Sequence, residues 1–431
     1  MKRPRSRGDP YRLSGTPNRS FNSRGASTRS SSGDFLSLIE SAAGSLRGAE
    51  VRTALIIHHG DADGICAAGI VKAALERMDW EAGTACLEKL FPEVLERIHA
   101  KAVDVLAYVD LGSPHVGRIS DINRGRRRVV VIDHHDPRSV DDPTLTHLNP
   151  ELSGLSGESE ACSSTIAYLL AKSLDAANSD LAPAALVGSA ELPGKISELN
   201  RIPLRDGEEN GVAKVTSTKR GESIKVKTGD SWWGRERASS LLTALGSVGY
   251  YRGGPRLALD AIERGITNEV KESAERWELE RRSKFNELFS RLRASGLRKT
   301  RRTQFVDVSD MLKGMGTKVI GTCLSIMRFK RFTDPNKYLL GFMLVEPEIP
   351  GLGSITRDWT KVSARVPPKL AQAISSGSTP PVSSLLSEAA ERVGGFGDGH
   401  AFAASGIIPK VSQEAFLGRA DEIACGPKRA R

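Results

Sequence analysis

The sequence has few cysteines and no long apolar run. Its five cysteines are scattered through 431 residues, and no two of them are separated by only two residues. This spacing supports neither a disulfide framework nor a structural zinc site. No apolar run approaches the roughly 20 residues that cross a bilayer, and the basic, polar N-terminus has no apolar signal-peptide core. The sequence therefore predicts a cytoplasmic protein with no membrane partner.

Acidic residues are in the minority. The chain has 62 Lys and Arg against 52 Asp and Glu, a net charge of +10, which favours a polyanionic partner such as nucleic acid. Part of this excess lies in the tails. Residues 1–33 are rich in Arg, Ser and Gly without an apolar face, so we expect a disordered basic tail, either an arm that binds nucleic acid or a solvated segment. Residues 421–431 form a second basic tail.

Strand-like and helix-like segments alternate between residues 34 and 250, which is typical of a doubly wound parallel sheet. Buried strands are expected at 54–57, 104–110 and 127–133, and the apolar run 182–192 is interpreted as a further strand. The polar residues 203–230 interrupt this alternation. They predict an inserted hairpin or surface loop.

A long helical stretch from Arg256 to about Ser295 follows. It either joins two domains and packs on both, or belongs to one domain as an ordinary amphipathic helix. Strand-like segments then return, and a helix and a glycine-rich run follow them; these segments are 303–309, 318–327, 338–346, 382–393 and 394–406. The predicted fold is therefore α/β, with a doubly wound sheet over 34–250, a connecting helical region over 251–297 and a smaller α/β domain over 298–420.

Carboxylates and imidazoles stand where three of the predicted strands end. The first strand leads into HHGDADG (58–64), the second ends on Asp110, and the third ends on Asp133, His134 and His135. Ligands bind at this carboxyl edge in open parallel sheets. Carboxylates can bridge two divalent ions, and imidazole completes their coordination without adding charge. The candidate ligands are His59, Asp61, Asp63, Asp110 and His134.

The ligand chemistry favours hard ions. No thiol belongs to the cluster, so Mn²⁺ or Mg²⁺ suits it better than structural zinc does, and the histidines favour Mn²⁺. Each aspartate taken alone could instead be the N-cap of the following helix, and His58 a packed side chain at a strand end. The combination of three strand ends is what favours a metal site.

Four segments, in this order along the chain, resemble the motifs of the DHH phosphoesterase family and, within it, of the RecJ-like nucleases of archaeal type. They are HHGDADG (58–64), VDLG (109–112), DHH (133–135) and DGHAFAASG (398–406). The last resembles the GGHxxAAG motif of the family's C-terminal DHH-associated domain. The resemblance spans about residues 50–410.

This resemblance implies a role for each site residue. One metal ion would be held by His59, Asp61 and Asp110, and a second by Asp63, Asp110 and His134, with Asp110 as the bridge. Asp133 would orient the neighbouring histidines, and His135 would contact the scissile phosphate. Gly399 and His400 would hold a phosphate of the nucleic-acid end, because glycine lets the backbone approach an anion closely. A flexible glycine hinge is the alternative for this run.

Two departures from the family pattern are visible. The fourth motif normally supplies one more metal-binding aspartate after a strand and a glycine, where this chain has Glu191 as its nearest acid. Glu191 would either complete the second metal site through its longer side chain or leave that site weakened. Asp398 and Ser405 replace the outer glycines of the last motif. Asp398 would repel a phosphate if it pointed at one.

Three functions follow from the resemblance. The first is a Mn²⁺-dependent exonuclease that digests single-stranded DNA or RNA by two-metal hydrolysis, with Mg²⁺ as the alternative ion. The basic and aromatic run MRFKRF (327–332) suits a single-strand track, or else is a solvated strand edge. The second is a weak or inactive DNA replication factor that assembles with GINS and the replicative helicase. The third is hydrolysis of oligoribonucleotides or cyclic dinucleotides.

Overall fold

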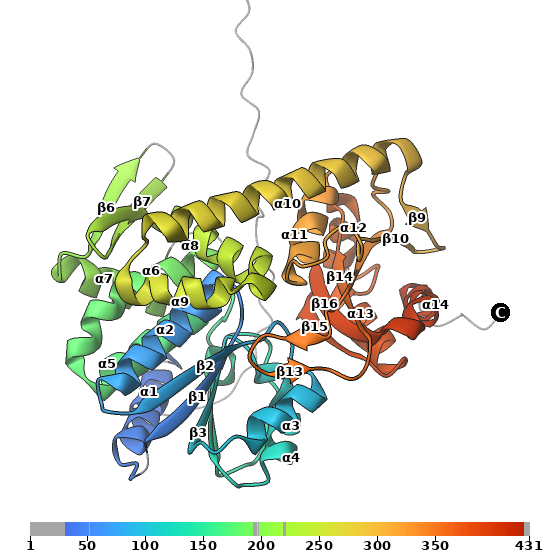
Figure 1. Cartoon of the computed structure of the whole chain (residues 1–431). Coiled ribbons are helices and arrows are strands. Elements are labelled where there is room, and N and C mark those ends of the chain that lie inside the picture. The colour runs from blue at the N-terminus through green and yellow to red at the C-terminus, as the bar shows by residue number, and fades with distance from the viewer. Residues whose placement is uncertain (1–30, 51, 193–195, 197, 219–220, 426–431) are drawn as a thin grey trace, which may run out of the picture.

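Figure 1 shows the computed structural model of the chain, which describes residues 31–50, 52–192, 196, 198–218 and 221–425. Most of the two predicted basic tails lies outside these residues. The tail boundaries were set too far inward, because Ser31 already begins helix α1 (Ser31–Arg47) and 421–424 belong to helix α14 (Gln413–Ala424). Helix α1 extends this far because Phe35 and Ile39 bury their side chains completely. None of the described helices is long and apolar enough to cross a membrane.

The first sheet has five parallel strands in the order β2-β1-β3-β4-β5. Its strands are β1 (Thr53–His58), β2 (Glu81–Cys86), β3 (Val105–Val109), β4 (Arg128–Ile132) and β5 (Leu145–Leu148). The strand order reverses between β1 and β3, so their carboxyl ends flank the crevice where such sheets bind ligands. The predicted doubly wound sheet is confirmed.

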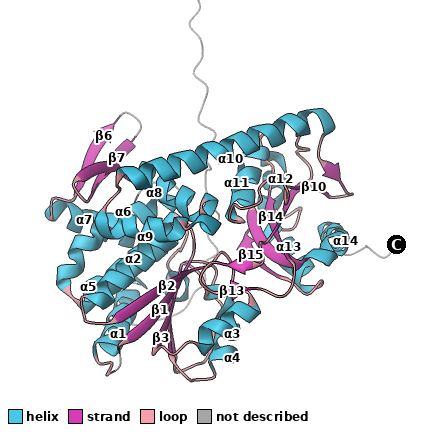
Figure 2. Ribbon diagram, in the orientation of Figure 1, coloured by secondary structure: helices cyan, strands magenta, loops and turns pink. Residues whose placement is uncertain are grey.

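Helices cover both faces of this sheet (Figure 2) because alternate residues of each strand enter different cores. Ile56 and Val109 pack in the core with α1, α2 (Ala62–Glu76) and α5 (Ser163–Leu174). Ile57 and Tyr108 pack in the other core with α3 (Pro92–Ala100) and α4 (Val116–Asn123).

The apolar run 182–192 is a helix, so its prediction as a strand was wrong. It forms α6 (Ala182–Gly188) and a 3₁₀ turn, Ser189–Glu191. Pro183 stands in the first turn of the helix, where its missing N–H costs nothing, and alanine is the strongest helix former. Glu191 therefore follows a helix rather than a strand.

The predicted insert contains a hairpin preceded by a helix. Helix α7 (Arg201–Glu209) leads into the antiparallel strands β6 (Ala213–Thr218), β7 (Gly221–Thr228) and β8 (Ser231–Gly234). The hairpin prediction is thus confirmed over 213–218 and 221–228. The part before it is helical because α7 buries Pro203 and Leu204 on one face.

The helical stretch after the insert is broken at Gly265, whose φ of +91° ends α9 (Gly254–Arg264). Helix α8 (Arg235–Thr243) precedes it, and α10 (Asn268–Ser295) follows and runs along the top of the molecule in Figure 1. The first half of α10 buries Trp277 against Gly249. Its second half buries Phe289, whose ring centroid lies 6.2 Å from that of Phe332. The helix therefore joins two domains and packs on both.

The second domain contains a sheet of six strands, in the order β15-β16-β14-β11-β10-β9. They are β9 (Arg298–Lys299), β10 (Thr303–Asp307), β11 (Tyr338–Leu344), β14 (Trp359–Arg365), β15 (Phe396–His400) and β16 (Ala403–Pro409). Helices α11 (Lys318–Met327), α12 (Pro368–Ser375) and α13 (Val382–Glu391) belong to the same domain, and β12 (Glu348–Ile349) pairs with β13 (Gly353–Ser354).

The segment 318–327 was predicted as a strand and is helix α11. Its buried residues Val319, Cys323 and Met327 recur every four positions, which is a helical spacing. The β-branched residues Val319 and Ile320 favoured the wrong prediction. Packing overrides this local preference, because α11 covers β11 and β14.

The two domains dock through apolar side chains. Phe91 precedes α3 in the first domain, and its ring centroid lies 6.1 Å from that of Trp359 in the second. Trp359 also meets Phe396, with ring centroids 6.3 Å apart. All three rings are nearly fully buried in the core that also packs α3 and α4. The docked arrangement is therefore part of the folded core.

We expect Gly249→Ala to destabilise the protein. A Cβ at this position would lie 2.1 Å from Cζ3 of Trp277, so α10 would have to shift. Overpacking of this kind lowers the free energy of unfolding by about 1–3 kcal/mol. Gly117→Ala is the matched control, because nothing lies within 4 Å of its Cβ and it stands in helix α4. Urea denaturation should show that Gly117→Ala keeps the free energy of unfolding of the wild type or raises it by up to about 1 kcal/mol. Equal effects of the two substitutions would contradict the packing of α10.

Candidate metal centre

Three buried carboxylates gather at the crevice between β1 and β3. Asp61 lies three residues after the end of β1 and caps α2, where its Oδ1 accepts a hydrogen bond from Gly64 N at 3.1 Å. Asp63 lies in the first turn of that helix. Asp110 directly follows β3 and holds a φ of +59°, which is uncommon outside glycine. The N-cap interpretation is thus correct for Asp61, but it accounts for only one of its oxygens.

Asp110 faces two histidines from opposite oxygens. Its Oδ2 lies 3.5 Å from His59 Nδ1, which is also 2.8 Å from Asp61 Oδ2. Its Oδ1 lies 3.5 Å from His134 Nε2, which is also 3.7 Å from Asp63 Oδ2. The fold thus brings together both predicted ligand sets, and Asp110 is the residue that they share.

The ring of His134 is held so that Nε2 points at the carboxylates. Its Nδ1 lies 2.6 Å from the carbonyl oxygen of Gly157, to which an N–H at that position donates. Histidines that bind metals are commonly oriented in this way, because the hydrogen bond leaves the other nitrogen free to coordinate. Gly157 has to be glycine, since a Cβ there would lie 2.0 Å from His134 O.

The beginning of α5 fixes the carboxylates. The backbone N–H groups of Ser163 and Ser164 donate to Asp63 at 2.9 and 2.8 Å, where the positive end of the helix dipole favours an anion. Ser163 Oγ also donates to Asp110 Oδ1 at 2.8 Å. Sequence reasoning missed both serines. The only signal was their position at the start of the apolar segment that forms α5.

Asp133, which is fully buried, and His135, whose side chain is 42% exposed, form an ion pair beside this cluster. Asp133 accepts hydrogen bonds from Ser113 N at 2.8 Å and from His135 Nδ1 at 2.7 Å. Burial raises the pKa of Asp133, but the charge and hydrogen bond of His135 outweigh burial and hold that pKa far below its usual range. Burial lowers the pKa of His135, and Asp133 overcomes this effect and raises it to about 9. His135 is therefore a cation at neutral pH.

Burial and the charges of neighbouring side chains shift the pKa values of the cluster. Burial raises the pKa of Asp110, and the nearby charges of Asp61 and Asp63 raise it further. Burial also raises the pKa of Asp61, but the charges of His59 and Lys318 outweigh burial and lower it well below the usual range. Three carboxylates in one buried site thus lack enough positive charge among the protein's own side chains. A divalent cation would supply it.

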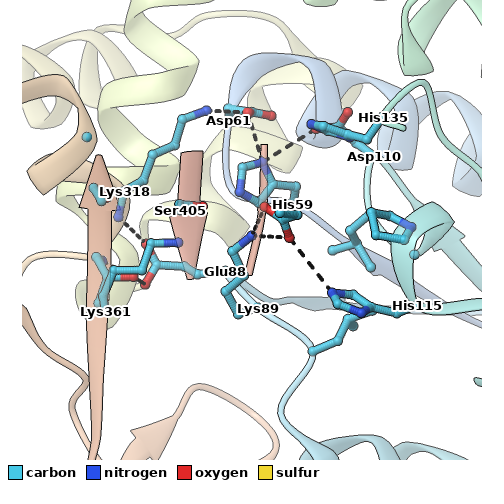
Figure 3. A pocket seen from close by; sticks show the side chains of 18 of the residues that line it. His59, Asp61, Glu88, Lys89, Asp110, His115, His135, Lys318, Lys361 and Ser405 are labelled. Atoms are coloured by element: carbon cyan, nitrogen blue, oxygen red, sulfur yellow. Dashed lines mark hydrogen bonds and ion pairs between the residues drawn. The ribbon is translucent and has the colours of Figure 1, made fainter. Parts of the chain in front are cut away.

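The site opens into a cleft of about 270 Å³ whose far wall belongs to the second domain (Figure 3). Four basic side chains line this cleft: Lys89, Lys318, Lys361 and Arg365. Lys318, at the start of α11, contacts Asp61 directly. Sequence reasoning missed these residues, because their positions carry no motif and the segment of Lys318 was expected to be a strand.

Asp398 does not present an unpaired charge to the cleft. Lys89 Nζ lies 2.8 Å from both of its carboxylate oxygens, and His115 Nε2 lies 3.8 Å from one of them. Burial raises the pKa of Asp398, but the charge of Lys89 outweighs burial and holds the pKa far below its usual range. Its replacement of a glycine in the fourth segment is thus balanced by a lysine from the first domain.

Gly399 and His400 lie at the edge of the second sheet. Gly399 has a φ of +147°, and a Cβ there would lie 2.4 Å from Ala404 Cα, so strand pairing requires glycine. His400 is about two-fifths exposed, and its Nδ1 lies 3.3 Å from Glu158 Oε1 of the first domain. Neither residue lines the cleft itself. His400 stands instead where the two domains face each other.

Glu191 lies apart from both groups around Asp110. It is exposed, and its Oε1 accepts a hydrogen bond from Thr243 Oγ1 at 2.6 Å. The same hydroxyl accepts a hydrogen bond from Ala62 N, next to Asp61. Glu191 therefore reaches the edge of the site through α8. Among the described residues, the close acid–histidine groups are His59 with Asp61 and Asp110, and Asp110 with His134 and His135.

The residues fit a divalent metal. Carboxylate oxygens and imidazole nitrogens are the donors, and the one free coordinating nitrogen of His134 points at Asp63 and Asp110. The fold and the site thus define a class: a doubly wound α/β protein with a carboxylate–imidazole centre at its switch point. Residues 53–189 match the N-terminal domain of the DHH family, so this chain contains a DHH-family domain.

The curated relative that matches is an uncharacterized protein of Methanocaldococcus jannaschii. It is 31% identical over 140 residues, which is 31% of this chain and 31% of that protein. The chain thus spans about a third of the length of this relative.

Solved structures share the fold over most of the chain. RecJ from Thermus thermophilus, in complex with Mn²⁺, superposes with a TM-score of 0.61 at 16% identity, over 90% of this chain and 55% of that one. An exonuclease RecJ bound to manganese superposes with a TM-score of 0.58 at 16% identity, over 90% of this chain and 94% of that one. CDC45 from Entamoeba histolytica superposes with a TM-score of 0.58 at 12% identity, over 91% of this chain and 99% of that one. The fold is RecJ-like, and CDC45 shares it equally well.

We expect Asp110→Asn to stabilise the metal-free protein while removing its response to metal. Burial, together with the charges of Asp61 and Asp63, raises the pKa of Asp110, so ionisation of Asp110 costs stability as the pH rises. Asparagine removes this cost and tolerates the positive φ. The gain should be present at pH 7 in EDTA and should vanish as the pH falls towards about 4, the ordinary pKa of an aspartate.

Mn²⁺ at 100 times its dissociation constant should add about 2.7 kcal/mol to the free energy of unfolding of the wild type. It should add little to that of Asp110→Asn. Thermal denaturation with EDTA or Mn²⁺ measures both effects. An equal response of both proteins to Mn²⁺ would exclude Asp110 as a ligand.

Proposed function

We propose that this chain is a metal-dependent phosphodiesterase, a RecJ-like exonuclease that degrades single-stranded DNA or RNA by two-metal hydrolysis. The observation that carries the proposal is the position of Asp110, buried at the switch point with a histidine 3.5 Å from each of its oxygens. Mn²⁺ is the preferred ion, with Mg²⁺ as the alternative, because the donor set combines carboxylates with imidazoles.

The proposed ligand sets are His59 with Asp61 and Asp110, and Asp63 with Asp110 and His134. The bound ions would neutralise charge on the phosphate oxygens and produce hydroxide near neutral pH. The serine amides at the start of α5 hold Asp63, and the hydroxyl of Ser163 holds Asp110, so these ligands are oriented before substrate arrives.

His135 is the proposed contact to the scissile phosphate. It lines the cleft, and Asp133 keeps its ring protonated, so it offers a charged N–H to a phosphate oxygen. Asp133 itself is fully buried and acts by orienting His135. This proposed division of roles agrees with the hydrogen bonds that Asp133 accepts from the backbone of Ser113 and His134.

The wall opposite the metal centre supports a polyanionic substrate. Arg365 lines the cleft, and its Nε donates to Ser325 on α11, a helix whose end lies beyond the residues that line the cleft. There Phe329 is 58% exposed, with Arg328 Cζ 4.7 Å from its ring centroid. An exposed ring beside cations suits a stacked base. Phe332, the other ring of this run, packs against Phe289 and is not free to stack. Gly399 and His400 are proposed to hold a phosphate at the domain boundary.

Two other functions compete with the nuclease. A weak or inactive replication factor that assembles with GINS and the replicative helicase has the likeness to CDC45 in its favour, as does the exposed position of Glu191. Hydrolysis of oligoribonucleotides or small cyclic nucleotides would need only the cleft. The buried carboxylates and histidines around Asp110 favour an enzyme over the inactive factor.

The deciding experiment is digestion of single-stranded DNA and RNA, each labelled at one end. We expect a ladder that grows from one end in Mn²⁺, and none in EDTA or with Asp110→Asn. Asp121→Asn is the control, because Asp121 is exposed on α4 and lies outside the metal cluster. Cleavage of short oligonucleotides alone would favour the small-substrate alternative. Intact strands under all conditions would favour the replication factor.

Glu191→Gln tests the proposed fourth ligand. If Glu191 completes the second metal shell, the loss of its charge should raise the Mn²⁺ concentration needed for half-maximal activity by about tenfold, the lower end of the effect of losing a supporting group. If it serves only as the partner of Thr243, the substitution should cost about 1 kcal/mol of stability and leave the Mn²⁺ titration unchanged. Glu236→Gln is the matched control, because Glu236 lies on α8 and lines the same surface pocket as Glu191.

A further inference from the structure

The outward face of the three-stranded sheet carries lysines and a tryptophan. Cross-strand partners in an antiparallel sheet point to the same side, and Lys214 pairs with Lys225 while Lys227 pairs with Trp232. All four side chains are exposed. The alternate residues, among them Val226 and Ile224, are buried against the domain. We call Lys214, Lys225, Lys227 and Trp232 the lysine–tryptophan face.

This face is unfavourable for folding alone. Two lysines directly opposite each other repel, and the described residues include no carboxylate within ion-pair distance of any of the three ammonium groups. Trp232 leaves 37% of its surface in water. Lys214 Nζ lies 4.1 Å from the centroid of the indole ring, which partly offsets both costs. A polyanion with aromatic groups would relieve the remaining repulsion and cover the ring.

The sheet is fixed to the body of the protein rather than hanging from it. Trp233, on its inner face, packs beneath Arg237, whose Cζ lies 5.5 Å from the ring centroid. Arg237 also pairs with Glu275 of α10 at 3.6 Å. Figure 1 shows the sheet at the end of the molecule where α10 begins, whereas the second domain stands where α10 ends. The sheet lies outside residues 53–189, which match the DHH family.

We propose that the lysine–tryptophan face binds single-stranded nucleic acid outside the metal cleft. Lysines would follow the phosphates, and Trp232 would stack on a base, the combination that single-strand binding surfaces use. An acidic polypeptide could use the lysines but offers no base to the indole ring. This inference rests on the proposed function. In this inference, the inserted sheet binds the part of a long single-stranded nucleic acid that extends beyond the cleft.

The test compares two variants of equal charge. Lys214→Gln/Lys225→Gln/Lys227→Gln removes the charges of the face. Lys101→Gln/Lys313→Gln/Lys369→Gln removes three exposed lysines from separate elements. Binding of a labelled long single strand is measured by fluorescence anisotropy in EDTA, which prevents cleavage, over a series of salt concentrations. Each lost phosphate contact makes the negative slope of log K against log salt less steep by about 0.7. The slope should therefore become less steep by about 2 for the face variant and should change little for the control.

Trp232→Ala tests stacking separately from charge. It should weaken binding at least about fivefold with an unchanged salt slope, because stacking on an aromatic side chain contributes about 1–3 kcal/mol for each base. Leu279→Ala, which removes another exposed apolar side chain, should change nothing. All variants should cleave an oligonucleotide of about 4 nucleotides as the wild type does, since the face lies outside the cleft.

The outcomes separate this inference from the proposed function. Wild type that binds no single strand would overturn both. Wild type that binds, with equal losses in the two triple variants, would overturn the face and leave the cleft function standing. Loss of short-oligonucleotide cleavage in the face variant alone would show that these lysines serve the cleft, against the inference. A salt effect without any effect of Trp232→Ala would exclude base stacking and indicate a general anion surface.

Discussion

Three carboxylates buried within one crevice place the strongest physical demand on this fold. A buried charge is costly unless it is paired or hydrogen-bonded, and like charges at close range add repulsion. The fold meets the demand with groups from distant segments. The amides of Ser163 and Ser164 bind Asp63, and His59 and Lys318 bind Asp61. What these partners leave uncompensated is the charge that a divalent cation would balance.

The same demand explains why the second domain is docked over the first. Lys318 can reach Asp61 only because Glu88 of the first domain accepts hydrogen bonds from the backbone of Thr317 and Lys318, at 2.7 and 2.9 Å. The apolar contact of Phe91 with Trp359 adds to these hydrogen bonds in holding the two domains together. The cleft is thereby acidic on one wall and basic on the other. A phosphate between the carboxylate cluster and this basic wall is the ligand that we propose for such a cleft.

Part of the fold could be predicted because β1, β3 and β4 are buried on both faces and so appear as continuous apolar runs, whereas the partly exposed β2 and β5 do not. The strands before Asp61, Asp110 and Asp133 were found in this way, and their ends named the candidate ligands. The prediction failed at 182–192 and 318–327, which are short apolar segments that periodicity cannot assign when every side chain is buried. The helix at 182–188 also removes one argument for Glu191 as a metal ligand, because that argument assumed that a strand precedes it.

The sequence by itself determined the class of the fold, its three central strands and the aspartates and histidines at their ends, because these follow from local periodicity and from the geometry of parallel sheets. Only the tertiary structure decided which groups complete the site. Ser163, Lys318 and Lys89 approach it from positions 53, 257 and 309 residues away from their partners. No local pattern records such contacts, since they depend on how helices and domains pack. The lysine–tryptophan face likewise exists only because strand register turns separated residues to one side.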